Sequence, residues 1–199
     1  MTYLSTLKTI ATRTFVTLLL ASASIVAHSQ EAKAPQVMMK TSMGDIVIEL
    51  YPDKAPKTVE NFLAYAKEGY YSGTIFHRVI NNFMIQGGGM TRNLEPKRPK
   101  NPIQIESQNG LKNKAGMVAM ARTSQPDSAT SQFFINTVDN PDLDFPAPDG
   151  HGYTVFGKVV KGIDVVNKIR AVPTIRTGNM GDVPVSSIMI DSVTLIATK

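Results

Sequence analysis

The chain has 199 residues, a formal net charge of +5 at pH 7 and no cysteine. This length predicts one domain, or one domain with a tail, with a core large enough to fold without disulfides. The lack of cysteine excludes thiolate catalysis and a disulfide framework, and it suits an exported protein in an oxidising compartment.

The first 29 residues are typical of a secretory signal peptide. Lys8 and Arg13 precede an uncharged, largely apolar run at Phe15–Ala27, and Ala27-His28-Ser29 places small residues at both flanking positions of a cleavage site. The run is shorter than the ~20 residues that span a bilayer, which favours cleavage over a membrane anchor. We therefore expect cleavage near Ser29 and a periplasmic protein. Losing the two basic residues lowers the net charge to +3, which gives little support for nucleic-acid binding.

A polar leader at 30–36 precedes the predicted domain, residues 37–199. Strand-like runs at 37–40 and 46–50 flank a loop that contains glycine, and this pattern predicts a β-hairpin. An amphipathic helix that stops at Gly69 is predicted next, because four apolar residues recur at helical spacing: Val59, Phe62, Leu63 and Ala66.

The central stretch, residues 76–89, reads FHRVINNFMIQGGG and contains two alternating segments. The dipeptide Asn81-Asn82 joins them as a turn, because asparagine tolerates left-handed backbone. The stretch can place one fixed cation (Arg78), two large apolar side chains and one amide (Gln86) around a small cavity. Because it holds no obvious nucleophile, it suits chemistry that breaks no bond.

The second half of the chain is predicted to contain short strands and one further helix. Residues 91–114 are polar loops with a short strand at 103–106, the second helix begins near Asp164, and residues 171–186 are expected to be irregular. Seven or eight strands with two helices favour an antiparallel sheet that closes on itself. The remaining strands are predicted at 116–121, 132–136, 153–160 and 187–196.

Each candidate residue also has an ordinary structural interpretation. Taken alone, Arg78 is typical of a surface ion pair, His77 of a structural histidine, and the apolar candidates of a core. A hydrolytic triad of Ser131, His77 and Asp127 has no supporting nucleophile-elbow pattern. His77 and His151 are the only histidines of the mature chain and show no metal-ligand spacing, so we expect no metal and no cofactor.

Several long motifs, in order, are similar to those of the cyclophilin-type peptidyl-prolyl cis-trans isomerases: FHRVINNFMIQGGG, GMVAMART, DSATSQFFIN, LDF and YTVFGKVVKG. The resemblance covers nearly all of residues 37–199, and the signal, the RTSQPDSATS loop and Tyr153 resemble the bacterial exported branch most. The resemblance implies a mainly β fold: a closed eight-stranded antiparallel barrel, capped by two α-helices, with a groove on one outer face.

The resemblance also implies the residues of the groove. The catalytic set is Arg78, Phe83 and Gln86. The substrate-binding set is His77, Met84, Ala121, Arg122, Gln132, Phe134, Leu143 and Tyr153. Ala121 and Arg122 are expected to offer main-chain groups to the peptide. Asp142 departs from the family, because many members carry a large aromatic residue there, and its carboxylate predicts weak binding of the family's cyclic-peptide inhibitor. Tyr153 stands where many members have histidine.

The implied activity is rotation about X-Pro peptide bonds, with unfolded or partly folded proline-containing exported proteins as partners. The alternative is a non-catalytic proline-peptide binding module or a holdase that uses the same groove, an alternative that Asp142 keeps open. We expect a monomer, because no apolar stripe is left over once barrel and helices are assigned. We expect no nucleic-acid partner, and no membrane attachment after signal cleavage.

Overall fold

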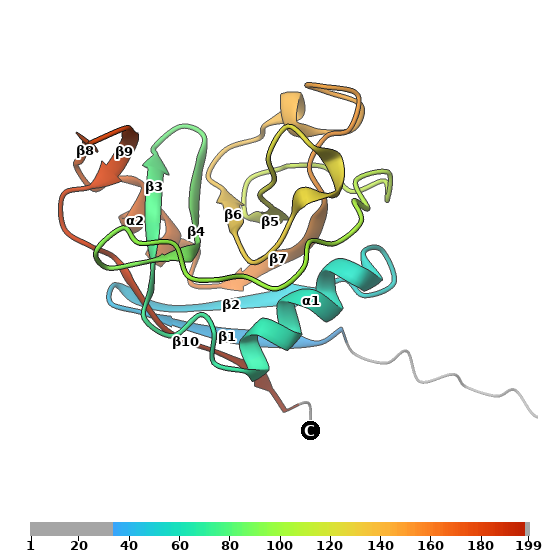
Figure 1. The fold of residues 1–199 in the computed structure, drawn as a ribbon. Coiled ribbons are helices and arrows are strands. Elements are labelled where there is room, and N and C mark those ends of the chain that lie inside the picture. Colours follow the sequence, from blue (N-terminus) through green and yellow to red (C-terminus); the bar gives the residue numbers. More distant parts are fainter. Residues whose placement is uncertain (1–33, 198–199) are drawn as a thin grey trace, which may run out of the picture. The chain divides into compact units, whose positions relative to one another are not determined.

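The computed structural model describes residues 34–197, so the predicted signal peptide at 1–29 lies outside the described residues. Eight strands form a closed antiparallel barrel with the order β1-β10-β3-β4-β6-β5-β7-β2, which confirms the predicted fold class (Figure 1). The barrel strands are β1 (Gln36–Thr41), β2 (Gly44–Leu50), β3 (Thr74–Ile80), β4 (Met84–Thr91), β5 (Met117–Met120), β6 (Phe133–Asn136), β7 (Val155–Lys161) and β10 (Met189–Ile196).

Two α-helices pack on the outside of the barrel strands. Helix α1 (Pro56–Lys67) packs against β10, and α2 (Ile163–Arg170) packs against β2 and β4. Two short 3₁₀ turns, η1 (Pro126–Ser128) and η2 (Pro141–Leu143), lie in the loops that follow β5 and β6. No helix within residues 34–197 combines the length and the apolar character that a membrane span requires.

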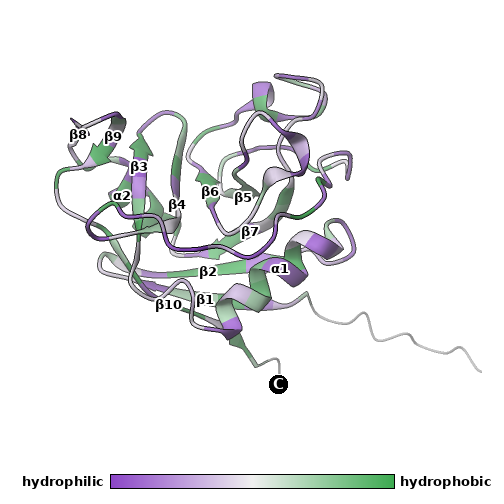
Figure 2. Ribbon diagram, viewed as in Figure 1, coloured by the Kyte–Doolittle hydropathy of each residue, from purple (hydrophilic) through white to green (hydrophobic). Residues whose placement is uncertain are grey.

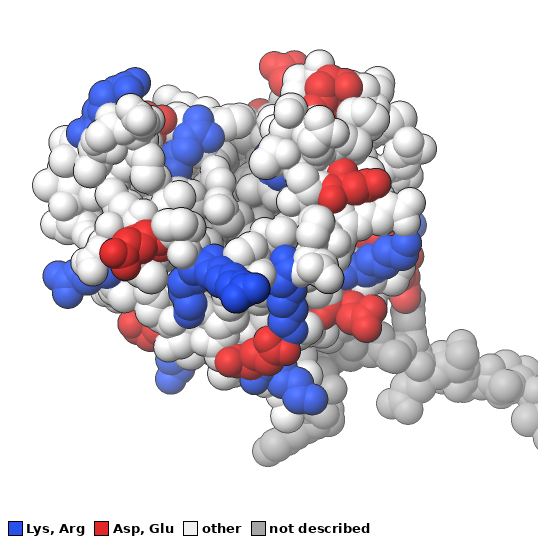
Figure 3. All heavy atoms as spheres, in the orientation of Figure 1, with Lys and Arg blue, Asp and Glu red and all other residues white. Residues whose placement is uncertain are grey.

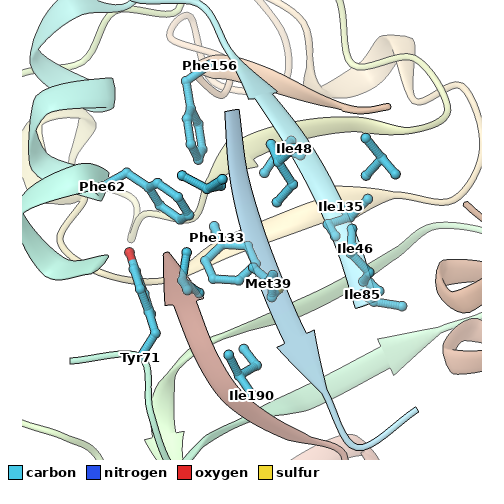
Figure 4. Close-up of a cluster of buried hydrophobic side chains, with 14 of the residues drawn as sticks. Met39, Ile46, Ile48, Phe62, Tyr71, Ile85, Phe133, Ile135, Phe156 and Ile190 are labelled. Atoms are coloured by element: carbon cyan, nitrogen blue, oxygen red, sulfur yellow. The ribbon is translucent and has the colours of Figure 1, made fainter. Parts of the chain in front are cut away.

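Every second residue of a strand points toward the barrel interior, and the interior is apolar because these residues are apolar. Val37 and Met39 of β1 and Ile46 and Ile48 of β2 are fully buried, as the alternation predicts. Figure 4 shows Met39, Ile46 and Ile48 in this core. Figure 2 shows the same division, with hydrophobic residues along the barrel strands and hydrophilic residues along the loop between β4 and β5. Each such large side chain contributes about 1.5–3 kcal/mol when it is fully buried.

Helix α1 closes the core with an aromatic cluster. The Phe62 ring lies 5.1 Å from the ring of Tyr71, 5.7 Å from that of Phe133 and 5.2 Å from that of Phe156, measured between centroids (Figure 4). All four side chains are fully buried. The amphipathic helix predicted from the spacing of apolar residues therefore attaches the 51–73 segment firmly to the barrel.

The predicted strand at 103–106 is wrong, because these residues bond to side chains instead of to a neighbouring strand. Only Ile103 forms an isolated bridge, with Ala129. The Glu106 carboxylate accepts hydrogen bonds from the backbone N–H groups of Lys57 (3.1 Å) and Thr58 (2.9 Å) at the start of α1. The helix has no side-chain cap of its own, so Glu106 satisfies its first free N–H groups from a distant loop.

The prediction that residues 171–186 are irregular is also wrong. They form a two-stranded hairpin of β8 (Thr174–Thr177) and β9 (Met180–Pro184), which packs beside β3 (Figure 1). Its turn contains Gly178 at a positive φ of 57°, which glycine adopts without cost. Val183 and Pro184 of β9 are buried, whereas Ile175, the partner of Val183 on β8, is exposed, so β9 is the strand that holds the hairpin in place.

Candidate active site

A small pocket of about 160 Å³ lies on the outer face of the barrel, where β3, β4, β5 and β6 are neighbours. Figure 3 shows the surface hollowed between the part that carries β3 and the part that carries the 139–152 loop. Nine of the eleven sequence-predicted site residues line it: Arg78, Phe83, Met84, Gln86, Ala121, Arg122, Phe134, Leu143 and Tyr153. The pocket suits one small ring.

Strand register places the central residues of this pocket in one row. Arg78 pairs with Gln86 across β3 and β4, Gln86 pairs with Phe134 across β4 and β6, and Phe134 pairs with Ala119 across β6 and β5. Directly opposed residues of paired strands share one face of the sheet. The cation, the amide and the aromatic ring therefore stand side by side on the outer surface.

The floor of the pocket is a second apolar cluster, separate from the barrel core. Met84 and Phe134 are 3% and 4% exposed, and Ala119 and Val155 are fully buried with them. Among the partly buried side chains that pack around this floor, Phe83, Leu143 and Tyr153 are the large ones that line the pocket, and they form its walls. A ring bound here meets a dry surface below and water only above.

Gln86 is held by Gln132, the one sequence-predicted residue that lies just beside the pocket. The Gln86 Nε2 atom donates a hydrogen bond to Gln132 Oε1 at 2.8 Å. Gln132 lines a neighbouring cavity that shares Gln86, Ala121 and Arg122 with the main pocket. Its side chain crosses β4 at Gly89, where an added Cβ would lie 2.3 Å from the Gln132 Cγ atom. Glycine is therefore required at position 89 for this contact.

Arg122 uses its side chain inside the protein, where sequence reasoning expected only its main chain to matter. Its guanidinium makes a bidentate pair with Asp149 at 2.8 and 2.7 Å, and its Nε atom donates to the Gly152 carbonyl at 2.9 Å. It stacks 4.6 Å from the Tyr153 ring centroid, and its side chain is 2% exposed. The hydrogen bonds from Arg122 hold the pKa of the exposed Asp149 carboxyl down at about 2. Arg122 thus ties the 139–152 loop to the wall of the pocket.

The sequence comparisons agree on one family. The sequence model described as "Cyclophilin type peptidyl-prolyl cis-trans isomerase/CLD" matches residues 36–195. The chain belongs to this family. Peptidyl-prolyl cis-trans isomerase B of Escherichia coli (strain K12) is 55% identical over 161 residues, which cover 80% of this chain and 98% of that protein. The peptidyl-prolyl cis-trans isomerase of Acinetobacter baylyi is 56% identical over 79% of this chain and 83% of its own length.

A solved structure agrees with the barrel. The cyclophilin type isomerase of Cryptosporidium parvum, crystallised in the presence of the dipeptide Ala-Pro, superimposes with a TM-score of 0.68 at 29% identity. The match covers 82% of this chain and 99% of that one. Fold, family and enzyme class are thus established: the protein is a peptidyl-prolyl cis-trans isomerase of the cyclophilin type.

One expected substrate contact of this cyclophilin, His77, does not lie at the pocket. His77 is 4% exposed and lies outside both cavities, because β3 turns its side chain away from the face that carries Arg78. Burial, followed by the nearby Arg78 charge, lowers the pKa of His77 to about 4, so the imidazole is neutral at pH 7. Ala121 does line the pocket, but its N–H donates to the Gln132 carbonyl at 3.0 Å, so a peptide cannot use this N–H.

Two acidic residues near the pocket have no counterpart among the predicted site residues. Asp149 binds Arg122, and Asp182 on β9 lies 3.6 Å from the Arg78 Nε atom. Asp142, which the sequence singled out, is exposed on η2 and is not part of the pocket lining. No group of three or more histidine or acidic side chains within residues 34–197 comes together as a metal site.

Proposed function

We propose that the Arg78 pocket binds the proline of an X-Pro peptide in unfolded or partly folded exported proteins and accelerates rotation about that bond. The observation that supports this proposal is the row of Arg78, Gln86 and Phe134, whose aromatic ring belongs to the buried apolar floor. The same row suits a reaction that makes and breaks no covalent bond, because no serine, threonine, lysine, histidine or acidic side chain of residues 34–197 lines the pocket.

The chemistry of the amide assigns Arg78 its role. The X-Pro bond resists rotation by about 18–20 kcal/mol, because resonance is lost when the amide twists. In the twisted form the proline nitrogen regains a lone pair. A fixed N–H donor beside that nitrogen stabilises the twisted form selectively, and arginine remains protonated at any relevant pH. Arg78 is such a donor, with 42% of its side chain exposed at the pocket edge.

The apolar floor and the amide hold the substrate. Phe134 and Met84 exclude water from the proline ring, and a dry environment disfavours the polar planar amide more than the twisted one. Gln86 has two N–H groups and a carbonyl oxygen. One N–H is used by Gln132, so the second N–H and the carbonyl can bond to the peptide backbone while Gln132 fixes the orientation of the amide.

The energy of one hydrogen bond limits the rate acceleration that Arg78 can supply alone. One charge-assisted hydrogen bond supplies about 1.5–3 kcal/mol, which corresponds to about ten- to a hundredfold in rate. Positioning by Gln86 and desolvation by the floor supply the remainder, as differential binding of the transition state requires.

The compartment and the clients belong to the same proposal. The basic and apolar segments before Ser29 and the lack of cysteine support action in the periplasm after removal of residues 1–29. The mild charge of the mature chain supports protein clients over nucleic acid.

A protease-coupled exchange assay on an Ala-Pro peptide tests the assignment of this pocket. The purified protein should accelerate cis–trans exchange, and Phe134→Ala should lower peptide affinity and exchange together. If Phe134→Ala loses neither, the reaction takes place elsewhere. If the protein binds the peptide without accelerating exchange, the holdase alternative is right for this chain.

A further inference from the structure

The β8–β9 hairpin brings a carboxylate next to the Nε atom of the Arg78 guanidinium. Asp182 Oδ2 lies 3.6 Å from Arg78 Nε, and this is the one acidic group within 4.0 Å of Arg78 among residues 34–197. Basic and acidic side chains lie next to each other over β8 and β9 in Figure 3. The hairpin packs directly against β3, the strand that carries Arg78.

The position of Asp182 is set by the backbone of the hairpin. Its φ is +60°, in the left-handed region that few residues other than glycine adopt. Next to it, Val183 is 6% exposed, and at the hairpin base the Val185 N–H donates to the Pro173 carbonyl at 3.0 Å. The carboxylate therefore extends from an anchored strand. Glycine would adopt this backbone more easily, so the aspartate is the costlier residue for folding alone.

We propose that Asp182 is a positioning residue for Arg78: it holds the Nε edge of the guanidinium so that the two terminal nitrogens point at the peptide. The proposal rests on the proposed role of Arg78. At 3.6 Å the contact is an ion pair and not a hydrogen bond. A guanidinium is planar, so a carboxylate beside Nε favours orientations of the plane in which the Nη1 and Nη2 donors point away from it. Arg78 is otherwise half-exposed, and a free side chain of this length would have to lose rotamer freedom at every turnover.

If the pair had a purely structural role, removing Asp182 would lower folding stability and leave the rate of bound-state rotation unchanged. Arg78 and Asp182 have 42% and 44% of their side chains exposed, and exposed pairs of this kind contribute little to folding stability. The effect of removing Asp182 should thus appear in the rate of the bound-state rotation and not in thermal stability or peptide affinity.

Two variants of Asp182 remove the carboxylate without adding strain to the backbone at its positive φ. Asp182→Asn keeps the shape, and Asp182→Gly suits the positive φ. Exchange NMR on an Ala-Pro peptide gives affinity and bound-state interconversion separately. We expect both variants to slow interconversion by about two- to fivefold, equivalent to about 0.4–1 kcal/mol, with affinity within about twofold of wild type. The control is Asp164→Asn, which breaks an exposed pair with Lys168 on α2 and should change neither value.

A double-mutant cycle decides whether the carboxylate acts through Arg78. In an Arg78→Ala background, Asp182→Asn should slow the reaction no further. An equal slowing in both backgrounds would overturn the proposal, since Asp182 would then act independently of Arg78. A wild-type rate in Asp182→Asn, with a slow Arg78→Ala, would overturn it while leaving the role of Arg78 intact. If Arg78→Ala itself were as fast as wild type, the role of Arg78 and this proposal would fall together.

Discussion

Arg78 and His77 are adjacent in sequence but have opposite environments. Strand alternation points Arg78 to the outer face beside Gln86 and turns His77 into the protein, where it is 4% exposed. Family motifs include both residues, so the resemblance alone assigned both to the groove, Arg78 as a catalytic residue and His77 as a substrate-binding residue. Counting the alternation from Arg78 separates the two residues, and this signal was available in the sequence. The same count puts Phe76 on the Arg78 face, whereas a register irregularity between Phe76 and Arg78 leaves Phe76 in the core.

The buried His77 predicts an acid-sensitive fold. Its pKa is lowered from 6.5 to about 4, mainly by burial. Between pH 6.5 and about pH 4, His77 is therefore protonated in the unfolded chain but neutral in the folded chain. Stability should therefore be lost as the pH falls from 6.5 to about 4. His77→Gln should lose less over this window than wild type, measured by denaturant unfolding at pH 7 and pH 4.5. His151→Gln, at an exposed loop position, is the matched control. Parallel losses in all three proteins would contradict this origin.

At the scale of elements, alternation and helical spacing predict what the barrel and α1 do, because both patterns are local. The wrong predictions concern segments whose conformation depends on contacts with residues far away in the sequence. Residues 103–106 look like a strand, but Glu106 caps α1, and the Ile105 and Glu106 N–H groups donate to the side chains of Asp127 and Thr154. The β8–β9 hairpin depends on the buried contact of Val183, which no local pattern shows.

The capping contact gives a prediction for stability. Glu106→Gln removes the charge that accepts two backbone N–H groups and the Thr58 hydroxyl, so it should cost about 1–2 kcal/mol of unfolding free energy. Activity at 25 °C should stay unchanged, because Glu106 does not line the pocket. Chemical denaturation measures the unfolding free energy, and the exchange assay measures the activity. Glu60→Gln, exposed on the same helix, serves as control, and an equal loss in that variant would refute the cap.

At the scale of the whole molecule, most of the pocket could be predicted because the barrel brings distant motifs into one row. Nine of the predicted residues line it, from segments as far apart as Arg78 and Tyr153. The places of Asp149 and Asp182 beside the pocket could not be predicted. Each pairs with an arginine across a loop or hairpin whose conformation the sequence does not show.

Export is a prediction about the whole chain. The basic residues, apolar run and Ala27-His28-Ser29 sequence predict cleavage near Ser29. Intact-mass spectrometry of the protein from a periplasmic extract should give a chain that begins near residue 30. A mass that still includes residues 1–29 would refute the prediction.

The central claim is that Arg78 acts on the twisted amide whereas the apolar floor acts on substrate throughout. Exchange NMR on one Ala-Pro peptide, which separates affinity from bound-state interconversion, tests it most directly. Arg78→Ala should slow interconversion by about tenfold or more with little change in affinity, because one charge-assisted bond is lost in the transition state alone. Arg78→Lys should not restore the full rate, because a flexible ammonium cannot reproduce a planar donor.

Two further variants complete the measurement. Phe134→Ala should weaken affinity and rate together, because the floor holds the ring in every state. Arg98→Ala, an exposed arginine outside the pocket, should behave as wild type. If Arg78→Ala instead loses affinity in proportion to rate, Arg78 only binds the substrate, and selective stabilisation of the twisted amide by its guanidinium is wrong.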